Sequence, residues 1–120
     1  MDDLKPLPSL KCNYEFRRLY SRGKSVATAN IVVYCRRNGR KTNRLGITVS
    51  TKYGKAVRRN KVRRRLREIC RLNQNKLTHG HDLVIVVRMK SRDVEYARLE
   101  ADFLDSCGQL GILERPEAQR

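Results

Sequence analysis

The stretch AVRRNKVRRRLREICR, residues 56–71, combines an apolar helical stripe with an unusual density of arginine. At about 100° per residue, one arc of a helix collects its apolar side chains: Val62, Leu66, Ile69 and Cys70. The neighbouring arc collects polar and cationic ones: Asn60, Arg63, Arg64, Arg67 and Arg71. The spacing therefore predicts a helix over residues 56–76, anchored in a core on one side and cationic on another.

These cations have few acidic partners. Glu68 is the only acid between Lys55 and Lys76, and Arg64 or Arg67 is placed to pair with it. Like charges four residues apart each cost ~0.2–0.5 kcal/mol, so a merely solvated face explains this stripe poorly. Arginine also binds phosphate in a bidentate way and stacks on bases. The stripe therefore indicates contact with nucleic acid.

The charge of the whole chain points the same way. Lys and Arg total 28 against 12 acids, a net charge of +16 over 120 residues. A charge this large repels itself in the compact state, and phosphates are the densest counter-charge available. A membrane surface is the second option. No apolar run has the length of a transmembrane helix, and MDDLKPLPSL, residues 1–10, lacks a secretory signal, so we expect a cytoplasmic protein.

Hydrophobic periodicity and turn signals predict the order helix, strand, strand, helix, strand, helix. This is a single α+β domain, a small α/β sandwich with helices packed on a short sheet. The domain is expected over residues 13–110, between a flexible arm at 1–12 and a tail at 111–120. The elements besides the basic helix fall at 14–23, 29–37, 44–50, 82–88 and 93–111, and the continuous apolar run DLVIVV indicates that the last strand is central.

The chain shows no sign of a catalytic or metal site of its own. Its four cysteines contain no CxxC pair, which argues against zinc. Cys35 lies in an apolar run and Cys70 on the apolar helical stripe, which favours buried, reduced thiols. His79 and His81 lie in a Gly-containing loop without a third ligand nearby and are interpreted as polar loop residues. The acids give no defined pair for acid–base chemistry. We therefore expect neither catalytic residues nor a bound metal, and a peptide that is inactive alone.

Aromatic residues favour RNA over DNA as the partner. Phe16, Tyr20 and Tyr34 could stack on unpaired bases, although plain core packing explains Phe16 and Tyr20 about as well. The basic helix follows a strand, which does not fit a helix-turn-helix reader of duplex DNA.

At these residues the chain resembles a known family, the protein subunit of bacterial ribonuclease P. GKAVRRNKVRRRLRE, residues 54–68, is similar to the family signature of a glycine turn, an Ala-Val pair and an Arg-Asn-Arg core, with Lys61 in place of the last arginine. The resemblance continues over residues 10 to 108, in the ordered segments FRRLYSRGKS (16–25), IVVYCRRN (31–38), RLGITVSTKYGKAV (44–57) and GHDLVIVVR (80–88).

This resemblance implies a fold similar to the second domain of ribosomal protein S5, with a left-handed β-α-β crossover that is opposite to the usual hand. It implies a role in removing the 5′ leader of precursor tRNA. The catalyst would be a partner RNA that works with magnesium, while the protein, a monomer before assembly, would bind no cofactor, membrane or DNA.

The resemblance also assigns two sets of residues. Facing the catalytic RNA would be Arg59, Asn60, Lys61, Arg63, Arg64 and Arg67. Lining a cleft for the single-stranded leader would be Phe16, Tyr20, Tyr34, Lys52 and Arg88. A cleft of aromatics and cations binds a single strand with little sequence demand, because every base has a π-face.

Three alternatives stay open from the sequence. A ribosomal or RNA-chaperone protein would use the same basic helix without needing the cleft aromatics. A DNA-binding regulator would read base edges from that helix. A protein-only nuclease would need an acid–base pair or a carboxylate metal cluster, which the sequence does not offer.

Overall fold

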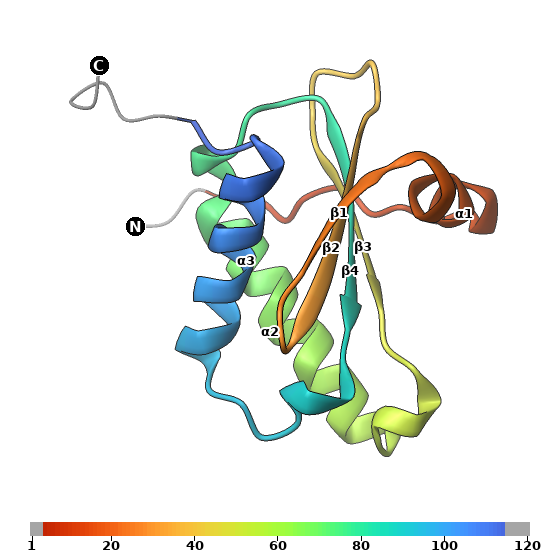
Figure 1. Cartoon of the computed structure of the whole chain (residues 1–120), viewed down its shortest axis with the longest axis vertical. Coiled ribbons are helices and arrows are strands. Elements are labelled where there is room, and N and C mark those ends of the chain that lie inside the picture. Colours follow the sequence, from red (N-terminus) through yellow and green to blue (C-terminus); the bar gives the residue numbers. More distant parts are fainter. Residues whose placement is uncertain (1–3, 115–120) are drawn as a thin grey trace.

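The computed structural model describes residues 4–114, which form a sheet with helices on both sides (Figure 1). Helix α1 lies on one side of the sheet, and α2 and α3 lie on the other. The elements are, in chain order, α1 (Asn13–Arg22), β1 (Lys24–Ala27), β2 (Ile31–Arg37), β3 (Arg44–Thr48), the 3-10 turn η1 (Thr51–Tyr53), α2 (Ala56–Asn73), η2 (Gln74–Lys76), β4 (His81–Val87), η3 (Met89–Ser91) and α3 (Tyr96–Leu110). The predicted α+β class is confirmed.

The sheet has four strands in the order β1-β2-β4-β3. Strand β4 is central, as its apolar run predicts, and it is antiparallel to β2 and parallel to β3. The short edge strand β1 was not predicted, because KSVA is mostly exposed and shows no apolar alternation. Strands β2 and β3 are not neighbours, since β4 lies between them. The β3-α2-β4 unit joins the two parallel strands, and the hand of its crossover stays a prediction.

The main core lies between the sheet and the pair α2 and α3. The four apolar residues predicted for α2 are all buried there, with Leu66, Ile69 and Cys70 fully inaccessible. Strands β2 and β4 contribute the opposite wall: Ile31, Val33, Leu83 and Ile85. Removing one such side chain as large as Leu66 would cost about 3 kcal/mol or more, because the cavity it leaves would not close fully. This packing fixes which side of α2 faces solvent.

The sequence places the apolar side of the third helix at Val94, Ala97, Leu99, Ala101, Phe103 and Leu104, and this prediction is partly wrong. Leu99 and Phe103 are buried and Leu104 is partly buried, but Ala97 and Ala101 are exposed, and Val94, which packs against the core, precedes the helix. Asp102 is buried instead, and its Oδ2 accepts a hydrogen bond of 2.7 Å from Asn30 Nδ2. This hydrogen bond satisfies two buried polar side chains that are 72 residues apart in the chain. Helical periodicity cannot predict such a pair.

Chain segments at both ends pack against the domain. The Leu10 N–H donates to the Leu45 carbonyl at 3.0 Å, and Leu10 is buried. At the other end, the Thr78 N–H donates to the Ile112 carbonyl at 2.7 Å, and Ile112 is buried. The packing thus runs across both expected boundaries of the 13–110 domain, which stay predictions. Residues 1–3 of the expected arm and 115–120 of the expected tail lie outside the described residues.

Helix α1 covers only part of the opposite side of the sheet, which we call the α1 face. Its buried Leu19 packs with Leu10 and Val84, and Phe16, Tyr34 and Val86 are partly buried against this small cluster. None of the helices among residues 4–114 is both long and apolar enough to cross a membrane.

Candidate nucleic-acid interface

The three aromatic residues predicted for the leader cleft come together on the α1 face. Phe16 is half-buried, because its ring packs over Gly46. A Cβ at Gly46 would come within 2.6 Å of the Phe16 ring. Glycine in this strand therefore has a packing reason, the close approach of an aromatic ring. Sequence reasoning missed this role of Gly46, although an isolated glycine in a strand is its usual signal.

Tyr20 and Tyr34 form an edge-to-face pair, with ring centroids 5.0 Å apart and planes at 75°. The Tyr20 hydroxyl shares a hydrogen bond of 2.9 Å with the Thr48 hydroxyl, which fixes the ring over β3. Tyr20 is nevertheless 40% exposed, so part of it remains free to meet a ligand. An ordered, partly exposed aromatic pair can stack on an unpaired base at little entropic cost.

The two cations predicted for the same cleft lie at the ends of strands. Lys52 is an exposed residue of η1, the turn between β3 and α2. Arg88 directly follows β4, and its Nη1 donates to the Thr28 carbonyl at 2.9 Å. Among residues 4–114, no hydrogen bond joins either cation to the three aromatic residues. The structure thus gathers the aromatics but not the cations.

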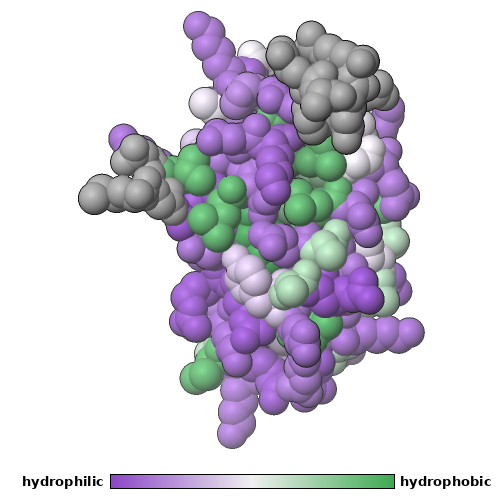
Figure 2. All heavy atoms as spheres, turned by 90° about the vertical axis from the view of Figure 1, so that its left-hand side faces the viewer, coloured by the Kyte–Doolittle hydropathy of each residue, from purple (hydrophilic) through white to green (hydrophobic). Residues whose placement is uncertain are grey.

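The residues predicted to face the partner RNA lie along α2. A hollow of about 790 Å³ runs over this helix, lined by Pro6, Asn60, Arg63, Arg64, Arg65, Arg67, Glu68, Arg71 and Tyr96. Arg63 Nη1 donates to Asn60 Oδ1 at 3.2 Å. Arg59 turns back instead, and its Nε donates to the Gly54 carbonyl at 3.1 Å. The side of the molecule that carries α2 and α3 is mainly hydrophilic (Figure 2).

Glu68 pairs with Arg71 and not with the expected Arg64 or Arg67. The distances are 2.7 Å from Arg71 Nε to Oε1 and 2.8 Å from Nη2 to Oε2. Arg71 Nη1 also donates to the Leu4 carbonyl at 3.1 Å, so the N-terminal segment helps to hold it. Within residues 4–114, Arg64 and Arg67 make no hydrogen bond or ion pair, and both are exposed. They are the cations of this surface most available to a phosphate.

The start of α2 adds positive charge to the positive end of a helix dipole. Lys55, the N-cap, makes no side-chain capping bond, and the first turn contains no acid. Arg58 and Arg59 lie in that turn, where cations are destabilising. The sequence therefore accepts a local cost that an anionic partner would offset.

A charged network holds α1 on the sheet. Arg44 contacts Glu15 of α1 and Asp82 of β4, each at 2.7 Å, and all three side chains are mostly buried. Burial would raise the pKa of Asp82, but the hydrogen bonds from Arg44 and Asn38 hold that pKa below its usual value. Burial opposes ionisation of Glu15 as well, and the Cys12 N–H together with Arg44 lowers its pKa. Both carboxylates are therefore ionised near neutral pH.

The thiols show no catalytic arrangement among residues 4–114, and His81, predicted to be a loop residue, is the first residue of β4. Burial raises the pKa of Cys35 to about 11 and of Cys107 to about 12, and raises that of Cys70 as well, so these thiols stay protonated. Cys35 and Cys70 are buried, as their apolar surroundings in the sequence predict, whereas Cys12 is exposed. Within the described part of the chain, no three His, Cys, Asp or Glu side chains gather closely enough to hold a metal ion.

A cationic helix on one side of a sheet and an aromatic face on the other define a small α+β protein built to bind nucleic acid. Comparison with known proteins identifies the family within this class. The family model described as Ribonuclease P matches residues 4–111, and the chain belongs to this family.

Its relatives match over nearly the full length. The ribonuclease P protein component of Natranaerobius thermophilus is 37% identical, with 93% of this chain and 97% of the relative covered. That of Pelotomaculum thermopropionicum is 40% identical over 98% and 99%. Among solved structures, the RNase P protein of Thermotoga maritima has a TM-score of 0.75 at 36% identity, covering 81% of this chain and 92% of that one. The Staphylococcus aureus protein has 0.81 at 30%, covering 88% and 97%.

Proposed function

We propose that this chain is the protein subunit of a ribonuclease P, the ribonucleoprotein endonuclease that removes the 5′ leader from precursor tRNA. The observation that carries the proposal is the placement of two binding surfaces on opposite sides of one sheet. The cationic surface of α2 and the aromatic α1 face are separated by the sheet itself (Figure 1). Such a protein can hold two RNA segments at once.

The α2 surface is assigned to the catalytic RNA. Arg64 and Arg67 are exposed, lack protein partners among residues 4–114, and border the hollow along the helix. Cations of this kind read the phosphate spacing of a folded RNA rather than its bases. Arg59 takes a different part, since its bond to the Gly54 carbonyl holds the turn before the helix. The remaining members of this set are Asn60, Lys61 and Arg63.

The α1 face is assigned to the leader. Tyr20 and Tyr34 offer stacking surfaces for unpaired bases, and each stack contributes ~1–3 kcal/mol. Phe16 supports this face from below and is a positioning residue. Lys52 and Arg88 would meet phosphates where the strand leaves the aromatics.

The chemistry itself is assigned to the RNA and its magnesium ions. The carboxylates of Glu15 and Asp82 are engaged by Arg44 and are not free to act as bases. The protein's part is to bind and orient two RNA segments, which lowers the magnesium concentration needed for productive binding because its cations offset phosphate repulsion.

A reconstitution assay tests this function. A bacterial ribonuclease P RNA and a labelled precursor tRNA are mixed at low magnesium, with and without the protein, and with each component alone. We expect mature 5′ ends only when the RNA is present, and many more of them when the protein is added. Cleavage by the protein alone would support the nuclease alternative. RNA binding without any gain in cleavage would support the ribosomal or chaperone alternative.

The leader assignment needs its own variants. Tyr20→Ala should weaken binding of precursor tRNA but not of mature tRNA. Tyr14→Ala is the matched control, because Tyr14 is an exposed tyrosine on the same helix that stacks with Arg18 and lies outside the aromatic cluster. Equal weakening of both RNAs by Tyr20→Ala would contradict a leader site.

A further inference from the structure

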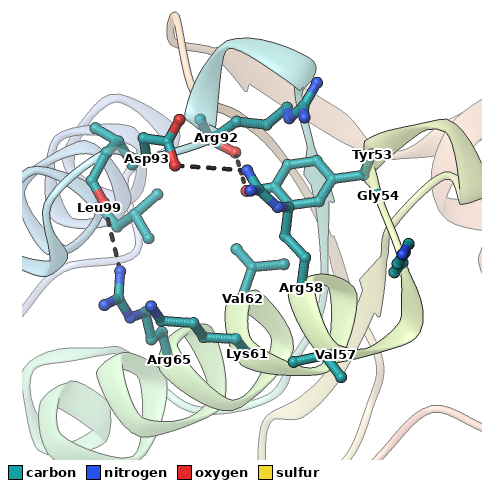
Figure 3. Close-up of a pocket in the computed structure, with 13 residues that line it drawn as sticks. Tyr53, Gly54, Val57, Arg58, Lys61, Val62, Arg65, Arg92, Asp93 and Leu99 are labelled. Carbon is teal, nitrogen blue, oxygen red and sulfur yellow. Dashed lines mark hydrogen bonds and ion pairs between the residues drawn. The ribbon is translucent and has the colours of Figure 1, made fainter.

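A second cavity lies beside the α2 surface, and of the residues that line it only Lys61 has a part in the assignments above. It encloses about 550 Å³ between the first turns of α2, the turn η1 and the segment that joins β4 to α3 (Figure 3). This volume falls within the ~300–1,000 Å³ that is typical of small-ligand sites.

The floor of this pocket is apolar. Tyr53, Val62 and Leu99 are buried beneath it, and the Tyr53 hydroxyl is bound to Ser91 at 3.1 Å. Val57 stands at the mouth, where it is 82% exposed, the highest fraction among the large hydrophobic residues described. A valine on the exposed first turn of a helix gains nothing from packing within the chain. The pocket therefore offers an apolar surface that a planar, apolar group could cover.

The rim of this pocket is cationic. It carries Lys55, Arg58, Lys61, Arg65 and Arg92 against a single acid, Asp93. Arg58 Nη1 reaches Asp93 Oδ1 at 3.5 Å, and Arg65 Nη1 reaches the Val94 carbonyl at 3.4 Å. Both bonds are long and use one of five N–H donors, so most of the donors of each guanidinium remain open. Lys61 and Arg92 are exposed, and their side chains make no hydrogen bond or ion pair among residues 4–114.

Asp93 has an unusual backbone at this rim. Its φ is 67°, the only positive value for a non-glycine residue among those described. Its side chain is 85% exposed and faces Arg58 across the pocket mouth (Figure 3). An exposed ion pair of this geometry contributes little to stability. Asp93 thus stands where an anion would bind, and it can be displaced from Arg58 at low cost.

We propose that this pocket holds one unpaired nucleotide of the partner RNA, an inference that rests on the proposed function. The phosphate would meet Arg58, Lys61 and Arg92 in place of the Asp93 carboxylate, and the base would cover Val57 and the apolar floor. The pocket is continuous with the α2 surface, because Arg65 borders both hollows. Its floor residues Tyr53, Val62 and Leu99 belong to the core on the α2 and α3 side of the sheet, which assigns the pocket to the catalytic RNA and not to the leader.

Two charge variants test the phosphate contacts. In the full-length protein, the double variant Arg58→Gln, Arg92→Gln should bind ribonuclease P RNA about tenfold more weakly. The slope of log affinity against log salt should become shallower by about 1.4, or ~0.7 for each phosphate that is no longer neutralised. The matched control is Arg40→Gln, Lys41→Gln, which removes the same charge from the exposed turn between β2 and β3 and should leave affinity nearly unchanged. If the two double variants lower RNA affinity and the salt slope equally, the proposed phosphate contacts in the pocket are wrong.

Asp93→Asn separates a ligand site from a structural clamp. The amide keeps the tolerance for positive φ but removes the charge that competes with phosphate. Affinity for the RNA should therefore rise several-fold. If Asp93 serves only to hold Arg58, the variant will bind no better than the wild type, which contradicts the proposal.

The base contact has a separate readout. Val57→Ser should weaken RNA binding without changing the salt slope, because the charge of the protein stays the same. Leu72→Ser, a change at an exposed leucine near the other end of α2, is the control and should bind as the wild type does. If Val57→Ser binds the RNA as tightly as the wild type does, the proposed contact between the base and this pocket is wrong.

A crosslink identifies the RNA. Arg92→Cys in a Cys12→Ser background, labelled with a photoreactive group and assembled with both RNAs, should crosslink to an unpaired nucleotide of the ribonuclease P RNA. Crosslinks to precursor tRNA alone, or spread evenly along either RNA, would overturn the inference. If Arg67→Gln weakens RNA binding while the pocket variants do not, the nucleotide site in the pocket is contradicted and the proposed function stands. If the wild type neither binds this RNA nor aids cleavage, both fail.

Discussion

The ring of Phe16 lies so close to Gly46 that a single added carbon on β3 would come within 2.6 Å of it. This contact couples α1 to the sheet at the point where the aromatic face begins. The face is therefore set by a residue without a side chain, and its shape is sensitive to the smallest substitution.

Gly46→Ala should destabilise the fold by about 1–3 kcal/mol, because the Phe16 ring must move out of a packed site. Urea denaturation measures the change. Gly108→Ala is the control, since a Cβ there meets only Leu113 at an ordinary 3.5 Å and α3 would gain helix propensity. If Gly108→Ala stabilises the protein and Gly46→Ala leaves its stability unchanged, the Phe16 ring is not packed against Gly46 as described.

Arg67→Gln should lower RNA affinity while leaving the melting temperature unchanged or slightly higher at low salt. Arg67 makes no hydrogen bond or ion pair among residues 4–114, and it is one helical turn from Arg63, so its removal relieves repulsion. Filter binding measures the RNA affinity, and differential scanning calorimetry measures the melting temperature. A clear fall in melting temperature would mean that Arg67 has a structural role.

The Arg44 network should make the protein sensitive to acid. The pKa values of Asp82 and Glu15 are lowered in the folded state, so their stabilisation is present above the usual carboxyl range near pH ~4 and is lost as pH falls through the lowered values. Arg44→Met should cost about 3 kcal/mol at pH 7, because two mostly buried carboxylates lose their partner. That cost should shrink at pH 3.

Arg98→Met serves as the control for this comparison. Arg98 is 64% exposed and lies 4.0 Å from Asp102, so its removal should cost less than ~1 kcal/mol at either pH. A pH-independent destabilisation in Arg44→Met would show that the side chain acts by packing alone.

One thiol should react far faster than the other three. Cys12 is exposed, whereas Cys35, Cys70 and Cys107 are buried with raised pKa values. A disulfide reagent at pH 8 should therefore titrate one thiol rapidly and all four only in denaturant. Cys12→Ser should abolish the fast phase. Two or more fast thiols in the folded wild type would contradict the burial described.

The candidate site could be predicted in part from the sequence. The cations of α2 were identified because helical periodicity places the apolar residues on one arc and leaves the arginines on another. The partner of Glu68 was not identified, because Arg64, Arg67 and Arg71 all lie close to it on the helix. Arg71 is held by the carbonyl of Leu4, which is 67 residues away in the chain. Gly46 and the pocket below Val57 were missed, since both depend on contacts between separate elements.

Most of the elements, the buried side of α2, the central place of β4 and the family could be predicted from local periodicity and from ordered motifs along one chain. Three features could not be predicted in this way: β4 lies between β2 and β3, Phe16 fills the space above Gly46, and Arg58 and Arg92 border the same cavity. The physical reason is that such contacts join residues far apart in the chain. Their partners are selected by packing over the whole domain, which no local pattern records.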